Sequence, residues 1–375
     1  MRFVLPLLLC LGACGGAQAA PVTAAPVTAA PPSAPALPDA DPGAPTEALL
    51  ALWESDEDPA RCPALLERLA EAPPEGAARL ARAGRAALAC EAPARARALL
   101  AASLREADAC LPRVQLAAAL RTLGNAPAAE AQLRATRRAH PRCVEAPLAQ
   151  ARLLGELGRG ADATAAARDA LALATGAERA RAFDALTRAH LAAGEPELAA
   201  LACRQALHVD PRRAASWHGC GLADLARGRL PEGLQSLERA RELDPGLIDA
   251  WLRHGQVALA HRDYEEAERL SRGALAQDPA SYDALVVRGI ALRALGRADE
   301  ARASYLRAIE VAPDRPEAWF DLAVLLQEEP RDRRDLDEAA RALRTFLNLV
   351  EGDPAYAHGA VRARDRLDAL GQSTN

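Results

Sequence analysis

The chain contains no lysine, because all 46 of its basic residues are arginine. This absence excludes chemistry that depends on a lysine amine, including Schiff-base formation and the phosphate-binding lysines of P-loop proteins and kinases. Aromatic residues make up only 3% of the chain, although 50% of it is hydrophobic. The interior must therefore be filled mainly by alanine and leucine, which suits helices that cross at short distances.

Signals for catalysis, metal binding and nucleic-acid binding are also lacking. The chain has no G-x-S-x-G or H-E-x-x-H motif, no G-x-G-x-x-G after a strand, and no strand pattern. Its seven histidines are scattered, and no cysteine pair has the C-x-x-C spacing. The net charge is −5 and the arginines are dispersed, so no basic stripe is available for a phosphate backbone. We predict no enzyme, cofactor, metal or nucleic-acid partner.

The chain does contain a regular repeat. Four prolines stand 34 residues apart: Pro211, Pro245, Pro279 and Pro313. Counted from three residues after each closing proline, the units begin at Cys110, Val144, Ala180, Ala214, Ile248, Tyr282 and Pro316. Position 4 is large in the last five units, which carry Phe183, Trp217, Trp251, Leu285 and Trp319. Positions 8 and 20 are small, and position 15 is glycine in five units. Arg113 and Pro147 depart from the pattern at position 4, and Arg262 departs from it at position 15.

This pattern resembles the tetratricopeptide repeat (TPR), a helix-turn-helix unit of 34 residues. The resemblance implies an all-α fold, a right-handed superhelical solenoid of antiparallel helix pairs. We expect the TPR array over residues 110–354, with an insertion at 328–335, and degenerate N-terminal helical repeats over 46–109. An amphipathic segment at 355–371 is expected to form a capping helix that covers the last apolar face.

The N-terminus predicts export. Residues 1–13 combine Met1-Arg2 with a short apolar run, as in a signal peptide, and end before Cys14 in the sequence Leu-Gly-Ala-Cys. This ending resembles the bacterial lipobox, which implies a lipidated Cys14 at the mature N-terminus and, with Gly15 next to it, an outer-membrane lipoprotein facing the periplasm. Ala17-Gln-Ala19 is a rival cleavage site that would release a soluble periplasmic protein. Residues 14–45 are rich in alanine and proline, which predicts a tether.

Six further cysteines fit an exported protein, where disulfides form and persist. The repeat frame places them in three neighbouring pairs, for which we predict disulfides: Cys62–Cys90, Cys110–Cys143 and Cys203–Cys220. The alternative is that these cysteines are free thiols that pack as small apolar side chains.

The family resemblance also implies a binding surface, because the first helices of TPR units line a concave groove with positions 2, 5, 9 and 12. Near the C-terminus these positions carry Leu252, Gln256, Val286, Ile290, Phe320 and Val324, with an acidic rim of Asp249, Asp283 and Glu317. We expect a protein or peptide ligand with an apolar face and basic groups, anchored on Phe320. The alternative is that the apolar side chains pack inside the solenoid. The Lys and Asn of the carboxylate clamp are missing at these positions, which disfavours a C-terminal carboxylate as ligand.

Two functions compete on this basis. The first is a membrane-tethered scaffold, similar to TPR lipoproteins that support pilus, outer-membrane or polysaccharide-export assembly. The second is a soluble periplasmic adaptor or accessory subunit of an enzyme.

Overall fold

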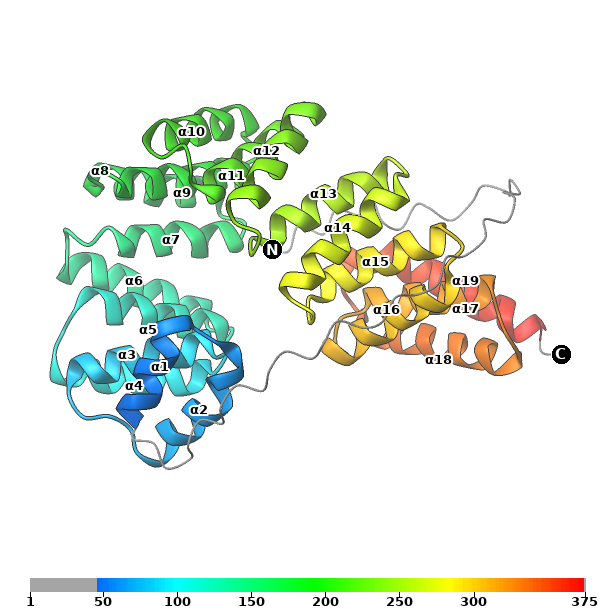
Figure 1. Cartoon of the computed structure of the whole chain (residues 1–375), viewed down its shortest axis with the longest axis horizontal. Helices are drawn as coiled ribbons and strands as arrows, with labels where there is room; N and C mark the ends of the chain where they lie inside the picture. Colours follow the sequence, from blue (N-terminus) through cyan, green and yellow to red (C-terminus); the bar gives the residue numbers. More distant parts are fainter. Residues whose placement is uncertain (1–45, 374–375) are drawn as a thin grey trace. The chain divides into compact units, whose positions relative to one another are not determined.

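The computed structural model describes residues 46–373, so the predicted signal peptide (1–13), Cys14 and the tether (14–45) lie outside the described residues. Over 46–373 the chain forms nineteen α-helices and two short 3-10 helices, and this range contains no strand. The prediction of an all-α fold is confirmed. The described helices form two compact units, which comprise residues 46–209 and 210–373 and are shown in sequence colours in Figure 1.

Unit 1 consists of five helix pairs. Its elements are α1 (Thr46–Asp56), η2 (Pro59–Arg61), α2 (Cys62–Glu71), α3 (Ala77–Ala89), α4 (Pro93–Glu106), α5 (Cys110–Thr122), α6 (Ala126–Ala139), α7 (Glu145–Glu156), α8 (Gly160–Leu173), α9 (Glu178–Ala192) and α10 (Pro196–Val209). The odd-numbered helices are the first helices of the pairs, and α3, α5, α7 and α9 contact one another in succession.

Unit 2 consists of four helix pairs and a final single helix. Its elements are α11 (Ala214–Ala226), α12 (Leu230–Leu243), α13 (Ile248–Ala260), α14 (Tyr264–Gln277), α15 (Tyr282–Ala294), α16 (Ala298–Val311), α17 (Glu317–Glu328), α18 (Arg333–Leu349), η3 (Pro354–Tyr356) and α19 (Ala357–Ser373). The first helices α13, α15 and α17 contact one another in succession, and α19 packs against α18. A helix thus stands where the sequence predicts the cap.

In six units the turn inside the helix pair uses a left-handed residue at position 15. Glycine occupies this position in five units, and the φ angles of these glycines lie between 72° and 77°. Such an angle costs glycine little, because glycine has no Cβ. Arg262 stands at the same position in the unit that lacks the glycine, and it adopts φ 61°. The left-handed turn is therefore kept in this unit, although arginine adopts a positive φ less readily than glycine.

Small residues allow the two helices of a pair to cross closely. A Cβ atom added to Gly289 on α15 would lie 2.4 Å from the ring of Tyr305 on α16. A Cβ atom added to Gly221 on α11 would lie 2.8 Å from the side chain of Leu237 on α12. Contacts this short do not occur between real side chains, so both crossings depend on glycine.

The tryptophans at position 4 tie each first helix to the loop before it. In three units the indole Nε1 donates a hydrogen bond to the carbonyl of the closing proline six residues earlier: Trp217 to Pro211 at 2.8 Å, Trp251 to Pro245 at 2.9 Å and Trp319 to Pro313 at 3.0 Å. A buried indole normally needs such an acceptor. Position 4 therefore fills the space between consecutive pairs and fixes the loop that joins them.

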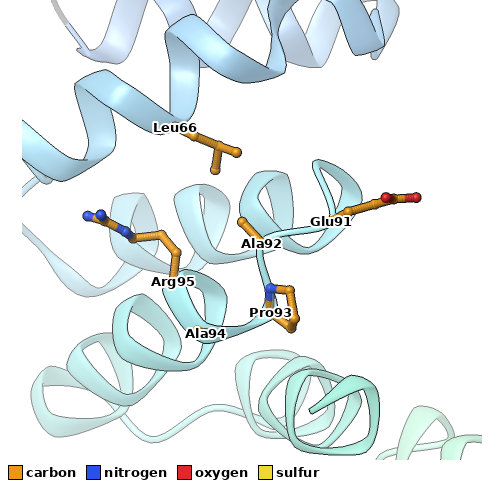
Figure 2. Close-up of a pocket in the computed structure, with 6 residues that line it drawn as sticks. All are labelled: Leu66, Glu91, Ala92, Pro93, Ala94 and Arg95. Carbon is orange, nitrogen blue, oxygen red and sulfur yellow. The ribbon is translucent and has the colours of Figure 1, made fainter. Parts of the chain in front are cut away.

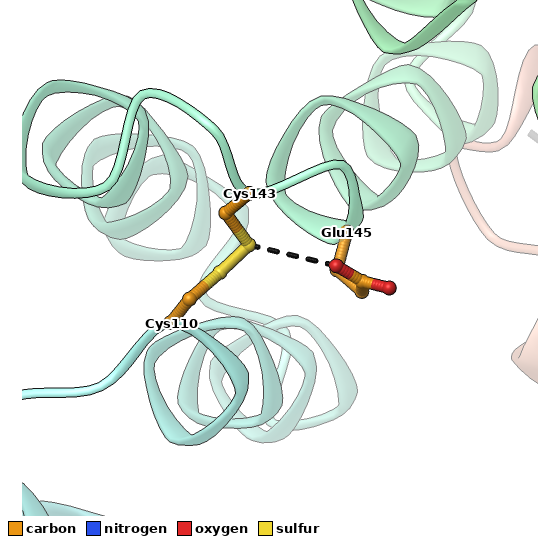
Figure 3. Close-up of side chains that lie close together, drawn as sticks. All are labelled: Cys110, Cys143 and Glu145. Carbon is orange, nitrogen blue, oxygen red and sulfur yellow. Dashed lines mark hydrogen bonds between the residues drawn. A yellow bond between two sulfur atoms is a disulfide. The ribbon is translucent and has the colours of Figure 1, made fainter. Parts of the chain in front are cut away.

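Two of the three predicted disulfides lie within unit 1. Cys62 is bonded to Cys90 and Cys110 to Cys143, with Cα–Cα distances of 5.3 and 6.3 Å. The second bond joins the start of α5 to the loop before α7, and therefore closes one complete repeat (Figure 3). Cys203 and Cys220 are also in the disulfide-bonded form, as the sequence predicts, and are not free thiols. Disulfides indicate an oxidising compartment outside the cytoplasm. Among residues 46–373, no helix combines the length and apolar character needed to cross a membrane.

Candidate protein-binding surface

The predicted binding surface lies on the first helices of unit 2. Asp249, Leu252 and Gln256 project from α13, while the corresponding positions of α15 and α17 carry the other residues of the predicted groove. Because α13 contacts α15 and α15 contacts α17, these positions follow one another across the unit. The predicted groove positions therefore lie side by side along successive first helices. Their side chains differ greatly in solvent exposure.

The predicted apolar patch is wrong, because four of its members are core residues. Val286, Ile290, Phe320 and Val324 are only 7%, 5%, 3% and 4% exposed, and they belong to one apolar core with residues of α18 and α19. The ring of Phe320 lies 5.1 Å from that of Phe346, and the Arg362 guanidinium lies 5.4 Å from its centroid. Phe320 is therefore covered by the last helices and cannot anchor a partner.

A smaller surface remains accessible on α13 and at the start of α15. Leu252 and Gln256 are partly exposed, and the side chains of Asp249 and Asp283 are 48% and 51% exposed. Arg253 donates a hydrogen bond to the Gln256 side chain at 3.2 Å, which orients the amide. These side chains can contact a partner, and we call them the α13 surface.

The acidic rim is largely paired within the protein. Asp249 lies 2.9 Å from Nε2 of His218 and 3.6 Å from the Arg253 guanidinium. Burial opposes ionisation of Asp249, but its contact with His218 and the nearby positive charges lower its pKa. Asp283 accepts a hydrogen bond from Arg315 at 2.7 Å. A basic ligand would therefore compete with resident cations, which weakens the electrostatic attraction that the sequence predicts.

Glu317 is a structural residue and not part of an open rim. Its carboxylate accepts hydrogen bonds from the hydroxyls of Tyr282 at 3.1 Å and Tyr356 at 2.8 Å. Its side chain is only 20% exposed. The position therefore joins α15, α17 and the segment before α19, and the prediction that it faces a ligand is wrong.

A second polar cluster follows at positions 12 and 13. Arg293 on α15 donates a hydrogen bond to Glu328 on α17 at 2.7 Å, and Arg366 on α19 donates one to Gln327 at 2.7 Å. Burial raises the pKa of nearby Asp321 to about 7, although the charge of Arg293 opposes this shift. The same two positions pair in unit 1, where Arg121 donates to Glu156 at 3.0 Å. Sequence reasoning did not identify this cluster, although the recurring Arg and Glu could have indicated it.

Two other places have a feature of a ligand site. Cys110, Cys143 and Glu145 are the one group of three metal-type donors within residues 46–373, but the two sulfurs are bonded to each other and are not thiolate ligands (Figure 3). A shallow cleft beside Leu66, Pro93 and Arg95 has few polar groups (Figure 2). The guanidinium of Arg95 already donates to the carbonyl of Leu69 at 3.1 Å. Neither place has the converging polar groups of a cofactor site.

The described structure thus defines a class: an α-helical scaffold built of stacked helix pairs. The family follows from the sequence, because residues 185–248, 252–316 and 288–343 match the model of the tetratricopeptide repeat. The chain is a TPR protein through this region. TPR proteins are generally non-enzymatic scaffolds for protein–protein interaction, and the fold indicates a protein partner.

Comparisons with solved structures find similar helical proteins. They include a MamA RS-1 ArsTM double mutant (18% identity, TM-score 0.41, covering 47% of this chain and 97% of that one) and a crystal structure of MamA (19%, 0.39, 44% and 95%). MamA 41-end from Desulfovibrio magneticus RS-1 has 18% identity and a TM-score of 0.41, and the match covers 47% and 97%. We infer nothing about function from similarities this low. No curated protein matches the sequence.

Proposed function

We propose that this chain is a protein-binding scaffold of a bacterial cell envelope, held at the membrane by a lipid on Cys14. In this role it supports the assembly of an envelope complex, such as a pilus, an outer-membrane machine or a polysaccharide exporter. TPR membership supports protein binding, and the disulfides support an exported protein. The sequence Leu-Gly-Ala-Cys14 supports the lipid anchor. Residues 14–45 would then act as a spacer that reaches up to about 90 Å at roughly 3 Å per residue.

One observation carries the binding proposal. On the α13 surface, Leu252 and Gln256 are partly exposed beside two carboxylates that remain about half exposed, Asp249 and Asp283. We propose that the partner places an apolar side chain against Leu252 and basic groups near the two carboxylates. A ligand cation must displace His218 from Asp249 or Arg315 from Asp283. These contacts therefore add more to the specificity of binding than to its affinity.

Site-specific photo-crosslinking in the native envelope tests this surface. A photoreactive amino acid at position 256 is expected to give one discrete adduct, which disappears when Asp249 and Asp283 are both replaced by arginine. The control carries the same group at position 307 on α16, where the Arg307 side chain is 55% exposed. Adducts of equal yield from positions 256 and 307 would contradict the proposal.

The lipid anchor has a separate test. Mass spectrometry of the mature N-terminus is expected to find an acylated peptide that begins at Cys14. A peptide that begins at Ala20 and carries no acyl mass would rule out the anchor. That outcome would favour the second candidate, a soluble periplasmic adaptor, because Ala17-Gln-Ala19 precedes this position.

A further inference from the structure

A cleft of about 550 Å³ lies in unit 1 between α6, α7 and α8. Pro147 of α7 lies in it, Arg137 lines it from α6, and Asp169 lines it from α8. Its rim carries further basic groups, Arg134, Arg138 and His140. The cleft is on a different unit from the α13 surface.

The repeat explains why the cleft exists. Pro147 occupies position 4, where the later units carry a large side chain, and Trp251 is its counterpart 104 residues further along the chain. Proline is tolerated in the first turn of a helix, where its missing N–H has no partner to lose. Its small ring, however, cannot fill the volume of an indole. We call the resulting cleft the Pro147 socket.

Trp251 shows what this volume holds in a complete unit. Its ring lies 4.6 Å from the guanidinium of Arg241, and a Cβ atom on Gly273 would lie 2.4 Å from it. Its Nε1 donates to the carbonyl of Pro245 at 2.9 Å. The ring is thus held by a cation on one side, a second helix on the other and one hydrogen-bond acceptor.

The Pro147 socket keeps two of these parts at the same spacing of 104 residues, because Arg137 corresponds to Arg241 and Pro141 to Pro245. Asp169 stands where the later unit has Gly273, so its side chain occupies part of the volume that the Trp251 ring fills. The two arginines also share their next contact, because Arg137 donates to Gln150 at 2.8 Å and Arg241 lies 3.1 Å from Nδ1 of His254. Gln150 and His254 are again 104 residues apart. Arg137 is therefore held in the position from which Arg241 meets an indole.

The charge around the socket is positive. No acidic residue occurs between Glu130 and Glu145, whereas this stretch carries four arginines and a histidine. Arg134 and Arg137 are paired with Glu130 and Asp169, and His140 lies 3.3 Å from the carboxylate of Asp108. Arg138 is exposed and, among the residues that the structure describes, has no ion-pair partner. The socket therefore has spare positive charge at its rim, and an acidic ligand complements it.

We propose that the Pro147 socket binds an acidic segment of a partner protein by receiving one of its aromatic side chains, tryptophan in the best case. The ring lies against Arg137, in the part of the cleft that the Asp169 side chain leaves open. Carboxylates beside the tryptophan contact Arg134 and Arg138. The ligand thus supplies from outside the side chain that this repeat lacks.

A peptide titration of the full mature chain with its disulfides intact tests the proposal. The probe is Asp-Glu-Trp-Glu-Asp labelled with 5-fluorotryptophan and followed by fluorine NMR. We expect a dissociation constant on the order of 100 μM, as for a short ligand with one anchor. The same peptide with alanine in place of tryptophan, followed by calorimetry, should bind at least about tenfold more weakly. Lys-Lys-Trp-Lys-Lys should show no binding.

Variants locate the binding. Pro147→Trp fills the socket and should abolish peptide binding, whereas Leu111→Trp adds an exposed indole on α5 and should leave binding unchanged. Arg138→Glu should weaken binding about fivefold or more, because it reverses a rim charge, and Arg105→Glu on α4 is its control. The comparison of Arg138→Glu with Arg105→Glu tests the proposal even if Pro147→Trp does not fold.

Four results would overturn the proposal. They are no binding at 1 mM peptide, equal binding of the alanine peptide, equal binding of the lysine peptide, and undiminished binding to the folded Pro147→Trp or Arg138→Glu variant. None of them bears on the α13 surface, which lies on unit 2 and is tested by crosslinking.

Discussion

Replacing Phe320 with alanine should destabilise unit 2 severely. The side chain is 3% exposed and lies 5.1 Å from the Phe346 ring, so alanine leaves a cavity between α17 and α18. Phenylalanine-to-alanine changes in a core cost about 3–5 kcal/mol, of which an aromatic pair supplies about 0.5–1.5 kcal/mol. For a unit of this size, that loss lowers the melting temperature by roughly 6–20 °C.

Urea unfolding followed by far-UV circular dichroism measures the effect. The matched control is Leu252→Ala, which truncates the same repeat position on α13, where the side chain is partly exposed. We expect the control to cost about 1–2 kcal/mol at most. A Phe320→Ala variant that loses less than about 1 kcal/mol, or less than the control, would refute the assignment of Phe320 to the core. The ring would then be available to a ligand, as the sequence alone suggests.

Three further predictions concern bonds, charge and backbone. Reduction of Cys62–Cys90 and Cys110–Cys143, which span 28 and 33 residues, should cost about 3.5 kcal/mol for each bond, and an unchanged urea midpoint in dithiothreitol would contradict this. Because burial raises the pKa of Asp321 to about 7, the folded state holds a proton that the unfolded state releases near pH 4, so stability should fall as pH rises from 4 through 7. Asp321→Asn should remove this dependence, as seen by comparing urea midpoints at pH 5 and pH 8. Arg262→Gly should stabilise unit 2 by about 0.5–1 kcal/mol, since glycine adopts the left-handed backbone conformation without the steric cost of a Cβ. Gly296→Ala should lower the urea midpoint for the same reason.

The helix pairs could be predicted from the sequence because each one repeats the same local signals. The glycine at position 15 ends a first helix wherever it occurs, and the closing prolines end the second helices. Arg262 is instructive, because the frame identifies it as a departure and the structure shows that the backbone keeps φ 61° at that position. Packing by the neighbouring repeats therefore outweighs the preference of one residue.

The binding surface could be predicted only in part, because exposure depends on contacts that the repeat frame does not contain. The frame assigns Phe320 to the same position as Leu252, yet only Phe320 has α18 and α19 packed over it. The Pro147 socket was visible in the sequence as a missing large residue at position 4. The residues that line the socket could not be predicted from the sequence, because Arg137 and Asp169 come from different helices and meet only in the folded unit.

The disulfides Cys62–Cys90 and Cys110–Cys143 also limit how far the chain can be stretched. When a protein is pulled from its ends, each residue that unfolds adds about 3.5 Å of length. The loops that Cys62–Cys90 and Cys110–Cys143 close contain 28 and 33 residue steps, which together withhold about 200 Å of extension until the bonds are reduced. Residues 62–90 and 110–143 therefore cannot be pulled out in an oxidising compartment, and a load on this protein must be borne or released by the parts of the chain outside these loops.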